Sequence, residues 1–113
     1  MNFGLDYDGT ITSDPELWKT WAFKAKARGH KVYVVTMRYP SELVAPTPID
    51  TVWFAIADKV IATSRLAKRP FMRNEGIDIH VWIDDHPEAV VLDAKDIWPD
   101  PAPEGQPVIP DYE

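Results

Sequence analysis

Four short apolar runs divide most of the chain, and each is followed by polar residues. They lie at residues 2–5, 32–35, 59–63 and 79–83. Nearly continuous apolar runs of this length are typical of parallel β-strands that are covered on both faces. The stretches between them carry helix signals, so the pattern predicts strands that alternate with helices.

The clearest helix signal follows the first run. Ser13-Asp14-Pro15-Glu16 combines a capping residue, a proline for the first turn and an acid near the positive helix end. Apolar residues then recur at helical spacing until Gly29, namely Leu17, Trp18, Trp21, Ala22 and Ala25. We interpret Trp18 and Trp21 as core residues rather than as a base-stacking pair.

Two shorter helices are predicted further along the chain. One covers residues 49–57, and the other covers about residues 70–75, with Pro70 in its first turn and Gly76 at its end. Between Tyr39 and Pro48 three prolines predict an irregular connection.

The alternation of strands and helices predicts an α/β fold, an open parallel sheet with helices on both faces. We expect one domain over residues 1–98. Beyond Trp98 the composition changes, because residues 99–113 hold five prolines among acidic residues. This tail is predicted to be extended and poorly ordered.

Composition narrows the class of protein. The chain has 113 residues, a 45% hydrophobic fraction and no cysteine, so disulfides and thiolate metal sites are excluded. Its net charge of −6 argues against non-specific binding to a phosphate backbone. No apolar stretch approaches the roughly 20 residues of a membrane span, and no secretory leader pattern is present. We therefore expect no membrane association and a cytoplasmic location.

Paired acids follow the first and the fourth apolar runs. Asp6 and Asp8 precede Gly9, and Asp84 is followed directly by Asp85. Carboxylates this close repel one another unless a cation or a proton lies between them. Asp-x-Asp-Gly also occurs in ordinary turns, but a second acidic pair after a buried strand is harder to explain in that way. A calcium-binding loop is excluded because Leu17 occupies its twelfth position.

Further polar groups are expected at the same edge of the sheet. Thr36 ends the second run and is followed by Met37 and Arg38. Lys68 is predicted in the loop just before the helix at about residues 70–75. It belongs to a basic cluster that also contains Arg65, Arg69 and Arg73. Ligands of open parallel sheets bind beyond the carboxyl ends of the strands, where strand order reverses, so these groups are candidates for one site.

With these residues the chain resembles the haloacid dehalogenase-like (HAD-like) phosphatase superfamily. Leu5-Asp6-Tyr7-Asp8-Gly9-Thr10 matches the first signature of the family, and Asp84-Asp85 matches the fourth. Thr36 stands for the second signature. The third is assigned to Lys68, with Arg69 and Lys59 as alternatives. The resemblance covers about residues 2–90.

The resemblance implies a set of catalytic roles. Asp6 would be the nucleophile and Asp8 the general acid and base, while Thr36 and Lys68 would bind the phosphoryl oxygens. Mg²⁺ would be held by Asp6, the Asp8 carbonyl, Asp84 and Asp85. Four further residues are expected near the substrate phosphate, namely Gly9, Thr10, Met37 and Arg38.

The chain departs from the family pattern in two ways. No inserted segment is long enough for a cap domain, so we expect a capless member with an open cleft. The chain is also near the lower size limit of the fold, and we expect a sheet that is either short or completed by a partner chain in a homo-oligomer.

The expected function is Mg²⁺-dependent hydrolysis of phosphomonoesters through an aspartyl-phosphate. The resemblance is strongest to nucleotidase-type and polynucleotide-end phosphatases, so the substrate is expected to be a phosphorylated small molecule or a nucleic-acid end. The alternative is a catalytically inactive phosphate-binding or scaffold protein of the same fold. The presence of every residue that the chemistry needs favours catalysis.

Overall fold

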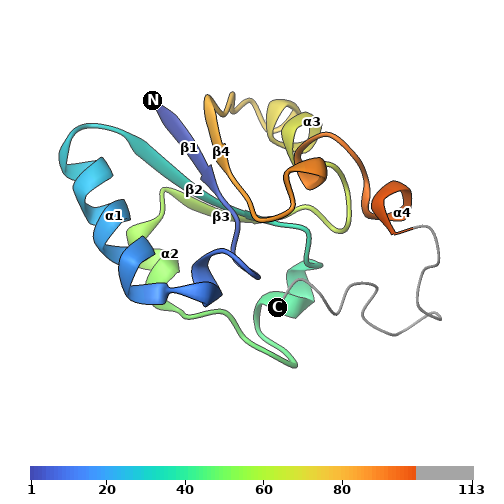
Figure 1. Ribbon diagram of the computed structural model, residues 1–113, viewed down its shortest axis with the longest axis horizontal. Coiled ribbons are helices and arrows are strands. Elements are labelled where there is room, and N and C mark those ends of the chain that lie inside the picture. The colour runs from blue at the N-terminus through green and yellow to red at the C-terminus, as the bar shows by residue number, and fades with distance from the viewer. Residues whose placement is uncertain (99–113) are drawn as a thin grey trace.

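The fold is built on a sheet of four parallel strands. The computed structural model describes residues 1–98. Its strands are β1 (Asn2–Leu5), β2 (Lys31–Thr36), β3 (Lys59–Ala62) and β4 (Val81–Ile83). They lie in the order β3-β2-β1-β4, with every neighbouring pair parallel (Figure 1). The predicted α/β class with an open parallel sheet is therefore confirmed.

Strand order reverses between β1 and β4. From β1 the chain moves outward to β2 and β3, and then returns to the other side of β1 to form β4. Leu5 pairs with Val34 on one side and with Ile83 on the other. The residues that follow β1 and β4 consequently leave the sheet side by side, at the place where ligands bind in sheets of this kind.

Helices cover both faces of the sheet, as predicted. Alternate residues of a strand point to opposite faces, and in β2 Val32 and Val34 belong to one apolar cluster while Tyr33 and Val35 belong to another. The helices α1 (Pro15–Ala27) and α2 (Val52–Ile56) pack on the first face, and α3 (Lys68–Asn74) packs on the second (Figure 1).

The first helix follows its sequence signals, except that Leu17, predicted in its apolar stripe, is exposed. The Asp14 side chain accepts a hydrogen bond from the Leu17 amide, and Pro15 begins α1. Gly29 follows the helix with a φ of +88°, a conformation that glycine adopts without strain. Trp18 and Trp21 are half-buried against the core and meet edge to face, which confirms their interpretation as packing residues.

The predicted start of the third helix was wrong. Lys68 is the first residue of α3 and does not lie in a preceding loop. Pro70 is the third residue of this helix, where a backbone N–H would have no partner within the helix, so its missing donor costs nothing.

The last strand is shorter than the apolar run. Only Val81–Ile83 pair as β4, while Ile79 packs in the core and His80 binds the chain start. The Asn2 amide donates to His80 Nδ1, and the His80 amide donates to the Asn2 carbonyl. A side chain therefore replaces one ladder bond at this point.

The remaining segments are short. Three 3₁₀ helices lie at Ile11–Ser13 (η1), Pro40–Leu43 (η2) and Pro87–Val90 (η3), and Ala94–Ile97 form α4. Within residues 1–98 the connections between strands hold only η1, η2 and helices α1 to α3, with no inserted domain, and η3 and α4 follow β4. The predicted tail at residues 99–113 lies outside the described residues. Among the residues described, no helix has the length and apolar character needed to cross a bilayer.

Candidate functional site

The carboxyl end of β1 delivers Asp6 into the interior. The Asp6 amide donates to the Ile83 carbonyl at 2.9 Å, which extends the pairing of β1 with β4 by one residue. The chain then turns back, and the Ile11 amide donates to the Asp6 carbonyl. Asp6 is 3% exposed, so its carboxylate is buried where the two strands end.

Gly9 lets this turn come close to the end of β4. Its φ is +86°, and a Cβ atom placed on it would lie 2.3 Å from an oxygen of Asp85. Any other residue would be both strained and in collision. Thr10 bridges the two strand ends, because its hydroxyl lies 3.2 Å from Asp6 Oδ2 and 3.1 Å from Asp85 Oδ1 and accepts from the Asp85 amide.

Three carboxylates converge at this point. Asp6, Asp84 and Asp85 each offer an oxygen, and these oxygens lie within 4.8 Å of one another. The side chains of Asp6 and Asp84 are each only 3% exposed, whereas Asp85 is open to solvent. The two predicted acidic pairs, one from each end of the domain, therefore contribute to one cluster.

Lys68 is the counter-charge within the cluster. Its Nζ donates to Asp6 Oδ1 at 2.7 Å and to Asp84 Oδ2 at 2.5 Å, and its side chain is fully buried. Burial disfavours the ammonium, but the charges of Asp6 and Asp84 outweigh it and raise the pKa of Lys68 above its ordinary value. Lys68 is therefore charged and fixed between two strand ends.

The donor set of the cluster fits a hard divalent cation. Carboxylate oxygens are the ligands that Mg²⁺ prefers, and the three acids with one ammonium leave two negative charges in a mostly buried place. Burial raises the pKa of Asp6 well above its usual value; Lys68 opposes this shift, and the charge of Asp84 adds to it. Either protonation of one acid or binding of a cation would reduce the repulsion among these carboxylates.

The Asp8 carboxylate is bound by Arg38. The Arg38 Nε donates to Asp8 Oδ2 at 2.7 Å, and Nη2 donates to Oδ1 at 2.6 Å. The two side chains are 6% and 9% exposed, so the pair is buried. The Asp8 carboxylate is thus not a member of the three-acid group, and the predicted metal contact through its carbonyl stays a prediction.

The residues after β2 take different positions. Thr36 ends the strand, fully buried, and its hydroxyl accepts from the Arg38 amide. The Met37 side chain packs in a small apolar cluster with Ala89 and Ala94, which is a structural position. Arg38 was predicted near a substrate phosphate, but the fork of its guanidinium is occupied by Asp8.

Among the three basic candidates for the third signature, the structure brings only Lys68 to the cluster. Lys59 begins β3 and is exposed at the opposite end of that strand. Arg69 is half-buried, and within residues 1–98 it forms no ion pair. Arg73 lies on the surface near Asp78.

The sequence patterns did not identify Glu42 as a residue of this region. Glu42 binds Arg65 through two hydrogen bonds of 2.9 and 3.1 Å. No motif marks Glu42, which lies in the proline-containing connection, and its partner is far away in the chain. The only signal was that Arg65 follows closely after the third apolar run, which predicts a position near the same sheet edge.

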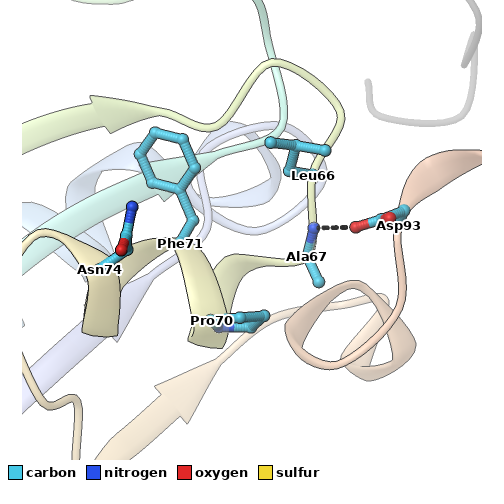
Figure 2. A pocket seen from close by; sticks show the side chains of 6 residues that line it. All are labelled: Leu66, Ala67, Pro70, Phe71, Asn74 and Asp93. Atoms are coloured by element: carbon cyan, nitrogen blue, oxygen red, sulfur yellow. Dashed lines mark hydrogen bonds between the residues drawn. The ribbon is translucent and has the colours of Figure 1, made fainter.

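A separate hollow of about 440 Å³ lies beside α3. Figure 2 shows its lining, which is mostly apolar and consists of Leu66, Ala67, Pro70, Phe71, Asn74 and Asp93. The Asp93 carboxylate accepts from the Ala67 amide at 2.7 Å and so holds the start of α3. None of the clustered acids lines this hollow.

Comparison of the chain with known proteins gave no match, whether to a protein-family model, to a curated protein or to a solved structure. Its function is therefore inferred from the geometry of the acids and of Lys68.

Proposed function

We propose that this protein is a Mg²⁺-dependent phosphomonoester hydrolase of the HAD-like type without a cap domain. The observation that carries the proposal is the convergence of Asp6, Lys68 and the Asp84–Asp85 pair where strand order reverses. A purely structural cluster of this kind would be costly, because three acids are gathered around one buried ammonium.

Asp6 is the nucleophile in this proposal. One of its carboxylate oxygens attacks phosphorus, the bond from phosphorus to the ester oxygen breaks, and an aspartyl-phosphate forms. Water then attacks the phosphorus, which releases inorganic phosphate and restores the carboxylate. Mg²⁺, held by Asp6, Asp84 and Asp85, would supply positive charge against the phosphoryl oxygens.

Asp8 moves the protons. It donates one to the leaving ester oxygen in the first step and takes one from the attacking water in the second. Arg38 holds both carboxylate oxygens of Asp8 and so orients the group. This contact makes Arg38 a positioning residue for Asp8 in the structure described.

Lys68 and Thr36 bind the transferring phosphoryl group. An ammonium has three donors, and Asp6 and Asp84 use two of those on Lys68. The third is left for a phosphoryl oxygen. The Thr36 hydroxyl lies at the end of the adjacent strand and adds a neutral donor. Gly9 and Thr10, in the loop after β1, border the same place.

The structure supports phosphate ester chemistry more than it supports a nucleic-acid substrate. Arg38 and Arg65, which could have formed a positive patch, are paired with Asp8 and Glu42. A nucleotide or a polynucleotide end remains our proposed substrate class from the resemblance, with Arg69 and Arg73 as the remaining basic groups on α3.

Turnover of p-nitrophenyl phosphate with and without Mg²⁺ tests the proposal. We expect Mg²⁺-dependent release of nitrophenol by the wild type and a loss of at least about 10³-fold in Asp6→Asn, because an amide cannot form the acyl phosphate. Asp96→Asn, an exposed acid in α4, is the matched control and should retain wild-type turnover. Full activity in excess chelator, or in Asp6→Asn, would contradict the proposal.

A further inference from the structure

The guanidinium of Arg38 holds more than Asp8. While Nε and Nη2 bind the carboxylate, Nη1 donates to the Glu42 carbonyl at 2.6 Å and to the Thr47 carbonyl at 2.5 Å. Both carbonyls belong to the connection at residues 39–48. The plane and rotation of the guanidinium are therefore set from two sides, by Asp8 on one edge and by this connection on the other.

The connection is in turn fixed by an ion pair at Glu42. The Glu42 carboxylate accepts from Arg65 Nη1 at 2.9 Å, from Arg65 Nη2 at 3.1 Å and from the Tyr39 amide at 2.6 Å. Although burial opposes it, the bonds from Arg65 and Tyr39 lower the pKa of Glu42 below its ordinary value. Arg65 also donates to the Met37 carbonyl at 2.8 Å and lies over the Tyr39 ring.

An unusual turn holds Arg65 in this position. Ser64 and Arg65 have φ values of +55° and +71°, a conformation that residues other than glycine rarely adopt. The Ser64 amide donates to the Arg38 carbonyl, and the Arg65 amide donates to the Met37 carbonyl. The turn after β3 is thereby bonded to the residues that follow β2. Strained backbone of this kind persists where the surrounding structure requires it.

Building on the proposed function, we infer that Glu42 and Arg65 are positioning residues for Asp8, which act through Arg38. Their ion pair fixes the Glu42 carbonyl, this carbonyl fixes Nη1 of Arg38, and the opposite edge of Arg38 aims the Asp8 carboxylate. Loosening the pair allows the guanidinium to rotate, and Asp8 then moves relative to the leaving oxygen.

The pair can be weakened without disturbing the core. Glu42 and Arg65 retain 24% and 11% exposure, and neither belongs to an apolar cluster of the described residues. A loss of activity in variants at these positions is therefore separable from a loss of fold.

Leaving-group dependence distinguishes positioning of Asp8 from general damage. Nitrophenolate departs without a proton, whereas the alkoxide of an alkyl phosphate needs one from Asp8. The experiment measures kcat/KM with Mg²⁺ on p-nitrophenyl phosphate and on glycerol phosphate for the wild type, Glu42→Gln and Arg65→Lys. It uses kcat/KM because this constant reports formation of the aspartyl-phosphate, the step in which the leaving group matters.

We expect each variant to lose about tenfold or more on the alkyl phosphate and less than about threefold on the aryl phosphate, since small misplacements of a proton donor have effects of this order. Asp50→Asn is the matched control. It weakens the partly exposed ion pair with Lys19, which lies beyond the far end of the same connection, and it should leave both constants unchanged.

The remaining outcomes overturn the inference. Equal losses on the two substrates, in variants whose melting temperature matches that of the wild type, would show a structural role only. Wild-type constants in both variants would show that the pair is not coupled to Asp8. If the wild type hydrolyses neither substrate, the proposed function fails and takes this inference with it.

Discussion

At the scale of single residues, Lys68 is the buried positive charge on which the acidic cluster depends. It is a fully buried ammonium that binds Asp6 and Asp84 at once. Pairs of this kind give little net stability when complete, but removal of one partner leaves buried charge uncompensated. The variant that removes the ammonium is therefore more informative than one that removes a surface lysine.

Lys68→Met should destabilise the metal-free protein by about 3 kcal/mol, because Asp6 and Asp84 lose the cation that they share. Urea denaturation in the presence of chelator measures this loss. Lys95→Met, on the exposed side of α4, is the control and should stay within about 0.5 kcal/mol of the wild type. Addition of Mg²⁺ should recover part of the loss in Lys68→Met. A variant as stable as the wild type would show that the acids are already protonated there.

The pH dependence of stability should carry the signature of Asp6. Its pKa is raised well above 3.8 by burial, against the effect of Lys68. Between 3.8 and the raised value, the native state holds a proton that the unfolded chain has lost, so this group's contribution to stability is present at low pH and is lost as pH rises.

Melting curves of the metal-free wild type and Asp6→Asn across that range isolate the effect. The melting temperature of the variant should exceed that of the wild type by an amount that grows with pH. A difference in melting temperature that does not change with pH would mean that the Asp6 carboxyl has the same pKa in the folded and in the unfolded chain.

At the scale of elements, the site depends on how closely the turn after β1 approaches the end of β4. Gly9 has a positive φ and no room for a side chain, because of Asp85. Gly29 offers a comparison, since its φ is +88° but a Cβ atom placed on it would meet nothing within 4 Å. The two positions share a positive φ, which would strain any substituted residue, and they differ in the collision that its Cβ atom would meet.

Gly9→Ala should therefore cost more stability than Gly29→Ala, for which roughly 1 kcal/mol of left-handed strain is expected. The difference should also appear in the affinity for Mg²⁺, measured by calorimetry, because the Asp85 carboxylate must move away from the new methyl group. Gly29→Ala should bind Mg²⁺ as the wild type does. Equal affinity in the two variants would separate Asp85 from the cation site.

Sequence patterns were informative where an element ends and weak where two irregular segments meet. The apolar runs correctly placed all four strands, and the acids that follow two of them lie together because parallel strands end at one edge. The start of α3 was misplaced because Pro70 was assigned to a first turn that begins two residues earlier. The bonds from Arg65 to Glu42 and from Arg38 to Asp8 had no periodic signal, since each partner lies in a turn or connection.

At the scale of the whole molecule, apolar clusters on both faces of a short sheet hold the domain. One cluster joins the sheet to α1 and α2, and the other joins it to α3. Both clusters are formed within residues 1–98, and the composition of residues 99–113 offers few apolar side chains among five prolines.

A chain that ends at Trp98 should consequently fold and turn over p-nitrophenyl phosphate like the full chain. We expect its melting temperature to lie within about 2 °C of the wild type, which corresponds to a few tenths of a kcal/mol for a domain of this size. Differential scanning calorimetry of the two chains makes the comparison. A large decrease would place part of residues 99–113 among the groups that stabilise the domain.

The three-residue β4 makes one edge of the sheet depend on the residues that follow β1 and β4. Within residues 1–98 only β1 pairs with it, so β4 lies at an edge of the described sheet and has few ladder bonds of its own. A cation shared by Asp6 and Asp84–Asp85 would tie the end of β1 to the end of β4. By mass action such a cation favours the closed chain over any state in which β4 has come away. The free energy of local opening at this edge would then rise with the concentration of the cation. The domain would be most resistant to opening when the cation is bound.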